Sequence, residues 1–283
     1  MIKLVLCDMD GTLVPFGADG VSTRSLRAIH TLMDAGIRFG PSSGRELSDL
    51  VRFFRGDFDC LKTGILGGGK LVYLDGKVVS KRPLPREELE GLVSALWGIR
   101  GACFNFYLPF EGSGNLDGGF GGIGLTPEEA ASMAESLGES FEEGLYQELP
   151  EGDITTGAVL VDTKVAEMND VHERLDSLCP KLDFVQSAPF VFDVVEKGWS
   201  KLDALPVLQD CLGVDLDEIA YFGDSHNDLT MLEAIPNSFC PSDGSDDALR
   251  IARYVIGSCA NDGVARVLES LALNGGALVE SEW

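Results

Sequence analysis

The alternation of apolar and polar positions over the first 80 residues predicts a series of strands and helices. Residues 2–6 form an uninterrupted apolar run, which predicts a buried strand. A helix is expected after a cap at Ser22 or Thr23, because apolar residues then recur at helical spacing and Gly36 supplies a stop. The remaining predicted elements of this part are a strand near 37–39, a helix over 45–55 and a hairpin over 71–79 that turns at Asp75-Gly76.

The middle of the chain, residues 84–198, follows a proline-containing linker and has a mixed α+β pattern. Thr126-Pro127-Glu128-Glu129 has the sequence of a capping box with proline at the first helical position, so a helix is expected to start there and to end at Gly138. The other predicted elements are helices over 87–97 and 165–178 and strands over 104–108, 158–161 and 190–195.

From Lys201 onward, strands and helices alternate again. Residues 219–222 form a continuous apolar strand of the kind that is buried on both faces. The other elements expected here are helices over 202–212, near 246–252 and from 262, and strands near 238–240 and 254–256. The predicted fold class is therefore α/β: a Rossmann-like parallel-sheet core, residues 1–83 and 199–283, with an α+β domain, residues 84–198, inserted in its middle.

Residues 119–124 match the dinucleotide-binding pattern GxGxxG. That fingerprint requires a strand before it and a helix that starts on it. No strand is expected before these glycines, and the helix that follows has its own cap at Thr126. We therefore interpret residues 112–124 as a mobile glycine-rich loop.

The charge balance limits the partners that the chain can bind. Lys and Arg number 22 against 46 Asp and Glu, a formal charge of −24, so nucleic acid and anionic membranes are not expected partners. The acidity fits either ordinary solubility or adaptation to high salt. The hydrophobic content of 45% is that of a soluble globular protein, and no apolar run reaches the roughly 18 residues of a membrane span. An anionic substrate would need local positive charge, from a metal or from particular Lys and Arg side chains.

The first residues and the cysteines favour a cytoplasmic protein. Residues 2–6 are too short an apolar run for a signal peptide. The seven cysteines are scattered, odd in number and without a CxxC pair, so we expect a reducing compartment and neither zinc nor a disulfide framework. Cys7, next to Asp8 in the apolar strand, is interpreted as a packing residue.

Two carboxylates follow the first predicted strand. Asp8 and Asp10 are two residues apart, so their side chains share a face while the chain stays extended, and Gly11-Thr12 then ends the strand. Such a pair is costly to keep ionised unless a cation or a proton lies between the two groups. The arrangement suits one carboxylate as nucleophile and the other as acid/base, with a divalent metal between them.

A second acidic cluster, Gly223-Asp224-Ser225-His226-Asn227-Asp228, comes where the apolar strand 219–222 ends. Because α/β folds bind ligands at the carboxyl ends of parallel strands, Asp224 and Asp228 are expected to converge with Asp8 and Asp10. Four carboxylates with oxygen ligands alone call for Mg²⁺. Helix capping would explain Asp224-Ser225 alone, but not the pair at 8 and 10.

These motifs resemble those of the haloacid dehalogenase superfamily. The likeness is to its Mg²⁺-dependent phosphatases with a large inserted cap of the type II, Cof-like class, and it covers the whole chain in order. Residues 8–12 match the first motif, Ser43-Gly44-Arg45 resembles the second with Ser for the usual Thr, Lys201 resembles the third and residues 223–228 match the fourth.

The resemblance implies a role for each motif residue. Asp8 would attack phosphorus and form an aspartyl-phosphate, while Asp10 would protonate the leaving oxygen and then activate water. Mg²⁺ would be held by Asp8, the backbone carbonyl of Asp10, Asp224 and Asp228. The expected partners of the phosphate and of the nucleophile are Ser43, Gly44, Arg45, Asn227 and Lys201.

Several supporting residues also have a purely structural interpretation. An arginine in the position of Arg45 is more often a solvated side chain in the first turn of a helix than a substrate ligand. Asn227 is also consistent with a residue that holds its loop. Lys197 competes with Lys201, and only the resemblance separates the two lysines. His226 is expected to pack in its loop rather than to act as a base.

We therefore expect a cytoplasmic Mg²⁺-dependent phosphomonoester hydrolase, a monomer or a homodimer. Its substrate would be a small phosphorylated metabolite, such as a sugar or polyol phosphate or a phosphoglycolate-like compound. Two alternatives stay open, a phosphosugar mutase with the same nucleophile and a catalytically silent regulatory relative. The motifs do not identify the substrate, because specificity would depend on the inserted domain.

Overall fold

The computed structural model describes residues 1–109, 118–137 and 144–283. By its internal contacts the chain divides into two compact units. One, called the core unit below, comprises Met1–Lys81 and Ser200–Trp283, and the other, called the inserted unit, comprises Arg82–Trp199.

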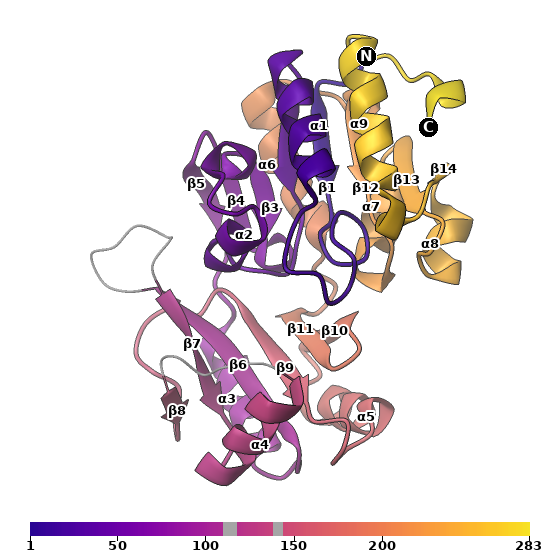
Figure 1. Cartoon of the computed structure of the whole chain (residues 1–283). Helices are drawn as coiled ribbons and strands as arrows, with labels where there is room; N and C mark the ends of the chain where they lie inside the picture. Colours follow the sequence, from indigo (N-terminus) through magenta and orange to yellow (C-terminus); the bar gives the residue numbers. More distant parts are fainter. Residues whose placement is uncertain (110–117, 138–143) are drawn as a thin grey trace. The chain divides into compact units, whose positions relative to one another are not determined.

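The core unit is built on a parallel sheet (Figure 1). Its strands, in spatial order, are β14 (Tyr254–Ile256), β13 (Asn237–Pro241), β12 (Ile219–Phe222), β1 (Leu4–Cys7) and β2 (Arg38–Pro41). The three strands β12, β1 and β2 are in register, with Cys7 opposite both Phe222 and Pro41. The residues that follow these strands therefore emerge at one edge of the sheet. The predicted α/β class with a parallel core is confirmed.

Helices cover both faces of this sheet. They are α1 (Thr23–Asp34), α2 (Leu47–Phe53), α6 (Lys201–Leu212), α7 (Leu229–Ala234), α8 (Asp246–Ile251) and α9 (Gly263–Leu273). Side chains of α1 and α9 share a buried cluster with Val5, whereas those of α6, α7 and α8 share another with Leu4. Neighbouring strand residues point to opposite faces, so the two clusters are the two sides of one sheet.

The predicted cap and hairpin of the first 80 residues are confirmed. The Ser22 hydroxyl accepts a hydrogen bond from the Ser25 amide and caps α1. A small antiparallel sheet contains β3 (Gly64–Leu66), β4 (Leu71–Leu74) and β5 (Lys77–Lys81). The turn between its last two strands has φ of 50° at Asp75 and 76° at Gly76, the left-handed conformation that an Asp-Gly turn supplies. The three-residue strand β3 is too short to show a period and was not predicted.

The inserted unit is a separate α+β body. Its sheet, in spatial order, is β10 (Leu182–Ala188), β11 (Val191–Glu196), β9 (Gly157–Val161), β6 (Ala102–Pro109), β7 (Gly118–Ile123) and β8 (Gly144–Tyr146). Helices α3 (Arg86–Leu96) and α5 (Met168–Leu178) bury their apolar side chains in one cluster with Phe104, and α4 (Pro127–Leu137) packs in another with Cys103. The predicted capping box at Thr126 and Glu129 is present.

The interpretation of residues 119–124 as a loop is wrong. Gly118–Ile123 is strand β7, paired antiparallel with β6. A Cβ atom at Gly121 would lie 2.7 Å from the Tyr146 ring and 3.0 Å from the Phe106 ring, so glycine here lets aromatic rings pack against the strand. The expected loop at 112–117 and the expected helix end at Gly138 lie outside the described residues.

Two further differences concern the inserted unit. Strands β8 and β10 were not predicted. Helix α5 begins at Met168 rather than at residue 165 because the amides of Val165 and Ala166 both donate to the carbonyl of Asp162.

Among the described helices, none is both long and apolar enough to cross a bilayer.

Candidate active site

Asp8 lies buried at the carboxyl end of β1, between two neighbouring strands. Its amide donates to the carbonyl of Phe222, the last residue of β12, and the Ser42 amide donates to the carbonyl of Cys7. Cys7 itself is fully buried, and burial raises the pKa of its thiol well above its ordinary value. The position of the nucleophile candidate is therefore fixed by the sheet register, and Cys7 is a packing residue.

Lys201 connects the first acidic motif to the last. Its Nζ lies 2.7 Å from Oδ1 of Asp8 and 2.7 Å from Oδ1 of Asp228, and the lysine is 2% exposed. It is the first residue of α6, which Ser200 opens through a capping box with Asp203. The competing Lys197 lies in the inserted unit, is mostly exposed and pairs with Asp183. Of the two lysines, Lys201 is therefore the one in contact with the carboxylates.

Asp228 is held on both of its carboxylate oxygens. Oδ1 accepts from Lys201 and, at 2.5 Å, from the Tyr221 hydroxyl, and Oδ2 accepts from the amides of Asp224 and Ser225 at 3.1 and 3.2 Å. Sequence reasoning did not identify Tyr221 as a site residue. Its only signal is a hydroxyl in the otherwise apolar strand β12, and such a group needs a partner when buried.

Asp224 is fixed by the first motif. The Thr12 hydroxyl donates to its Oδ1 at 2.7 Å. Gly11 has φ of +83°, and a Cβ atom there would lie 2.5 Å from Oδ2 of Asp224. A side chain at position 11 would thus be strained and would collide with the carboxylate, which explains the Gly-Thr pair after the two aspartates.

The site concentrates negative charge in a buried place. Carboxylate oxygens of Asp8, Asp224 and Asp228 lie within 4.8 Å of one another. Burial raises the pKa of Asp8 well above its ordinary value and that of Asp224 to about 7, and the charge of Asp228 adds to both shifts. Burial alone would lower the pKa of Lys201, but Asp228 and Asp8 outweigh it, so the lysine stays charged. One lysine does not balance three carboxylates, and the group therefore attracts a further cation.

Asp10 points to a different partner. Arg45 donates from Nε to its Oδ2 at 2.7 Å and from Nη2 to its Oδ1 at 3.0 Å, and the guanidinium lies 4.6 Å from the centre of the Phe53 ring. The Asp10 carboxylate is thus clamped by Arg45, for which the sequence allows either a solvated side chain or a substrate ligand. Three predicted metal residues therefore cluster through their carboxylates, and the carboxylate of Asp10 does not join them.

The remaining predicted residues lie in the loop after β2 and in the 3-10 turn His226–Asp228. Ser43 is buried, and its hydroxyl accepts from the Arg45 amide at 3.2 Å across Gly44. The side-chain oxygen of Asn227 accepts from the Ser225 hydroxyl at 2.9 Å, the loop-holding contact considered above. His226 is exposed, so the expectation that it packs in its loop is wrong. Direct contact of Ser43, Gly44, Arg45 and Asn227 with substrate stays a prediction.

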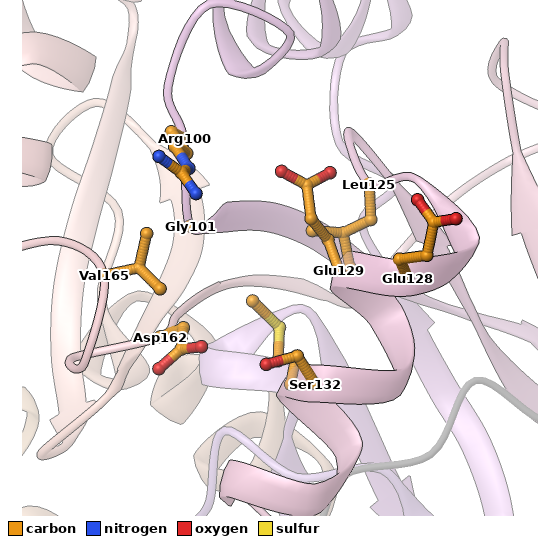
Figure 2. Close-up of a pocket in the computed structure, with 9 residues that line it drawn as sticks. Arg100, Gly101, Leu125, Glu128, Glu129, Ser132, Asp162 and Val165 are labelled. Carbon is orange, nitrogen blue, oxygen red and sulfur yellow. The ribbon is translucent and has the colours of Figure 1, made fainter.

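A cavity of about 230 Å³ lies within the inserted unit. Figure 2 shows Arg100 facing the α4 side chains Glu129 and Ser132, with Asp162 and Val165 on the adjoining side. None of the predicted site residues lines it. The candidate active site is therefore defined by the carboxylate cluster of the core unit and not by this cavity.

Comparison with known proteins identifies relatives of the whole chain. The sequence profile of the haloacid dehalogenase-like hydrolases matches residues 5–268. An HMP-PP phosphatase from Escherichia coli O6:H1 is 25% identical over 279 residues, which cover 95% of each chain.

Solved structures share the fold. A phosphatase of the haloalkanoate superfamily, BT1666 from Bacteroides thetaiotaomicron, aligns with a TM-score of 0.76 at 23% identity and covers 98% of this chain and 96% of its own. The subclass IIB sugar phosphatase BT4131 aligns with a TM-score of 0.74 at 18% identity and covers 97% of this chain and 100% of its own. Both the core unit and the inserted unit therefore have counterparts in known structures.

Proposed function

Since the chain belongs to the haloacid dehalogenase-like hydrolase family, we propose that it is a Mg²⁺-dependent phosphomonoesterase that acts through an aspartyl-phosphate on Asp8. One observation carries the proposal: a buried lysine bridges the carboxylates of Asp8 and Asp228 beside a third carboxylate, Asp224. This arrangement offers an oriented nucleophile together with a place for a cation.

The donor set fits Mg²⁺, because the clustered side chains offer oxygen ligands alone. Asp8 and Asp224 would hold the ion, with the backbone carbonyl of Asp10 as the resemblance implies. Both oxygens of Asp228 already accept two hydrogen bonds each, so we assign it to positioning Lys201 rather than to direct ligation. When bound, Mg²⁺ would neutralise charge on the transferring phosphoryl group.

The residues of the site account for both halves of the reaction. In the first, an oxygen of Asp8 bonds to phosphorus, the bond from phosphorus to the leaving oxygen breaks, and Asp10 gives that oxygen a proton. In the second, Asp10 takes a proton from water, the water oxygen bonds to phosphorus, and the bond from phosphorus to Asp8 breaks, which restores the carboxylate of Asp8 and the protonated acid of Asp10. Lys201 reduces the repulsion between Asp8 and the anionic phosphoryl group.

Arg45 and Ser43 support these steps. Arg45 holds the carboxylate of Asp10 through two hydrogen bonds and must share or release it when Asp10 carries a proton. Because the Ser43 oxygen accepts from the Arg45 amide, its own hydroxyl hydrogen is left to donate to a phosphoryl oxygen. We assign Gly44 and Asn227 to the loops that shape this phosphate position.

We further propose that residues 1–83 and 199–283 carry the chemistry and that the inserted residues 84–198 select the substrate. The substrate class is a small phosphorylated metabolite, such as a sugar or polyol phosphate or a phosphoglycolate-like compound. The named relatives, an HMP-PP phosphatase and a sugar phosphatase, support this class. The seven free cysteines fit a reducing cytoplasm, and we expect a monomer or a homodimer.

The test of the function is phosphate release from a panel of phosphorylated metabolites, measured with Mg²⁺ and with EDTA. Metal-dependent release of inorganic phosphate is expected, and the best substrate would name the reaction. Conversion of a hexose phosphate to its isomer without phosphate release would instead identify a mutase. A folded, Mg²⁺-binding protein that turns over no compound of the panel would leave the regulatory alternative.

Mg²⁺ binding is expected to weaken as the pH falls below about 7. The pKa of Asp224 lies at about 7 and that of Asp8 well above its ordinary value, so protons compete with the metal for these oxygens. Affinity should fall about tenfold per pH unit for each proton displaced. In the metal-free protein, protonated Asp8 and Asp224 contribute to the free energy of unfolding at acid pH, and this contribution is lost as the pH rises through their raised pKa values. Calorimetric titration between about pH 6 and 8 checks this, and a pH-independent affinity would contradict it.

Asp10→Asn is expected to separate the two half-reactions. Loss of acid/base catalysis should lower the turnover of a sugar phosphate by about 10²–10⁴-fold. An aryl phosphate has a leaving group that needs little protonation, so its phenolate should appear in a burst before the aspartyl-phosphate stalls. Stopped-flow absorbance measures the burst. Asp49→Asn, which removes the other carboxylate beside Arg45, is the control and should behave like the wild type. Equal losses on both substrates, without a burst, would move the acid/base role elsewhere.

A further inference from the structure

The core unit carries a second group of metal-ligating side chains, which the proposed hydrolysis does not use. His30 lies on α1, and Asp57 and Cys60 lie at the 3-10 turn Phe58–Leu61 that follows α2. A ring nitrogen of His30, a carboxylate oxygen of Asp57 and the sulfur of Cys60 lie within 4.8 Å of one another. The sequence gives no hint of this group, because no CxxC or His-x-His spacing connects its members.

The three side chains are held in place by the surrounding structure. Nε2 of His30 lies 2.6 Å from Oδ2 of Asp57, whose other oxygen accepts from the Asp59 amide at 3.3 Å. Cys60 is completely buried, while the side chains of His30 and Asp57 are 42% and 29% exposed. The sulfur of the group is therefore buried, whereas its nitrogen and oxygen ligands lie on a side that is open to solvent. An ion can enter from that side, and water there can supply a fourth ligand.

The donor types differ from those of the active site. Nitrogen, sulfur and one carboxylate oxygen suit Zn²⁺ and related transition ions, whereas Mg²⁺ requires oxygen ligands. Ligands about 2.0–2.3 Å from a tetrahedral ion lie roughly 3–4 Å from one another. The present group reaches that arrangement if the His30–Asp57 contact lengthens by about 1 Å as an ion replaces the hydrogen between the two atoms.

We propose that His30, Asp57 and Cys60 form a site for a zinc-type divalent ion, with water completing the coordination. Binding would form a metal–sulfur bond, release the thiol proton of Cys60 to solvent and leave His30 as a neutral ring with its hydrogen on Nδ1. A bound ion would link α1 to the 3-10 turn that follows α2 in the chain, and α2 is the helix that begins shortly after Arg45. Its effect would therefore be on the stability of the core unit and not on the chemical steps.

Co²⁺ added to the full-length protein tests the proposal, because a thiolate ligand gives a near-ultraviolet charge-transfer absorption that oxygen ligands do not. We expect this absorption to saturate at one equivalent, to disappear in Cys60→Ser and to need at least tenfold more Co²⁺ in His30→Gln. Zn²⁺ should displace the Co²⁺ and raise the melting temperature of the wild type, but not of His30→Gln. Asp224→Asn should keep the absorption, so the result does not depend on the hydrolase proposal.

Two control variants match the proposed ligands. Cys211 is an exposed cysteine on α6, and His172 is a half-exposed histidine 3.9 Å from Asp176, with no cysteine in the same group. Cys211→Ser and His172→Gln should therefore keep the absorption. No charge-transfer absorption in the folded wild type would overturn the proposal, as would its loss in Cys211→Ser. Should Cys60→Ser fail to fold, an unchanged titration of His30→Gln, altered only at a partly exposed side chain, would overturn it equally.

Discussion

Asp8→Asn is expected to abolish phosphate release, with a loss of at least about 10⁴-fold in kcat. Asparagine has the shape of aspartate but lacks the charge and nucleophilicity that bond formation to phosphorus requires. The buried position of Asp8 leaves little room for another group to take its place: its oxygen lies 2.7 Å from Lys201 and its backbone is fixed by β12. Steady-state phosphate release, with and without Mg²⁺, measures the loss.

A control and a second measurement separate this effect from misfolding. Asp19→Asn removes the same charge from an exposed position of the loop that follows the first motif and should retain wild-type activity. Circular dichroism should show both variants folded. Trapping with a phosphorylated substrate should give a protein-bound phosphate in the wild type and none in Asp8→Asn. Residual turnover above about one per cent would assign the nucleophile elsewhere, since removing a nucleophile costs far more than that.

The parallel core could be predicted because its strands are buried on both faces. Residues 219–222 are continuously apolar, and the hairpin at 71–81 has an Asp-Gly turn whose left-handed geometry few other residues adopt. Strand β7 could not be predicted in this way. Its glycines give no period, and what makes it a strand is the packing of the Phe106 and Tyr146 rings against Gly121, a contact between distant segments.

The clustering of Asp8, Asp224 and Asp228 could likewise be predicted, since the carboxyl ends of neighbouring parallel strands meet at one edge. The side-chain partners could not. Tyr221 donates to Asp228, and Arg45 clamps Asp10 rather than facing solvent. Both contacts depend on side-chain rotamers that only the packing of the folded structure sets. The sequence could not separate Lys197 from Lys201 for the same reason. Both lysines precede or open the same helix, and only in the folded structure is Lys201 alone buried against the carboxylates of the site.

Lys201→Met is expected to lower both stability and activity. Methionine fills similar volume but leaves Asp8 and Asp228 buried without their shared cation, and breaking such a pair costs about 3–5 kcal/mol. Loss of the cation beside the nucleophile should also lower kcat by about 10²–10³-fold. Lys197→Met removes an exposed lysine paired with Asp183 and should change stability by less than about 0.5 kcal/mol. Urea unfolding and phosphate release measure the two effects.

The double variant Lys201→Met/Asp228→Asn distinguishes charge imbalance from lost packing. Removing one of the two stranded carboxylates should restore most of the lost stability while activity stays low, because the nucleophile still lacks its cation. Lowering the pH should likewise reduce the stability loss of Lys201→Met. Protonation of Asp8, whose pKa burial already raises, removes its repulsion with Asp228, so the loss should shrink as the pH falls. A defect that is independent of pH and unchanged in the double variant would mean that Lys201 acts through its packing, and Asp8 would then need another source of positive charge.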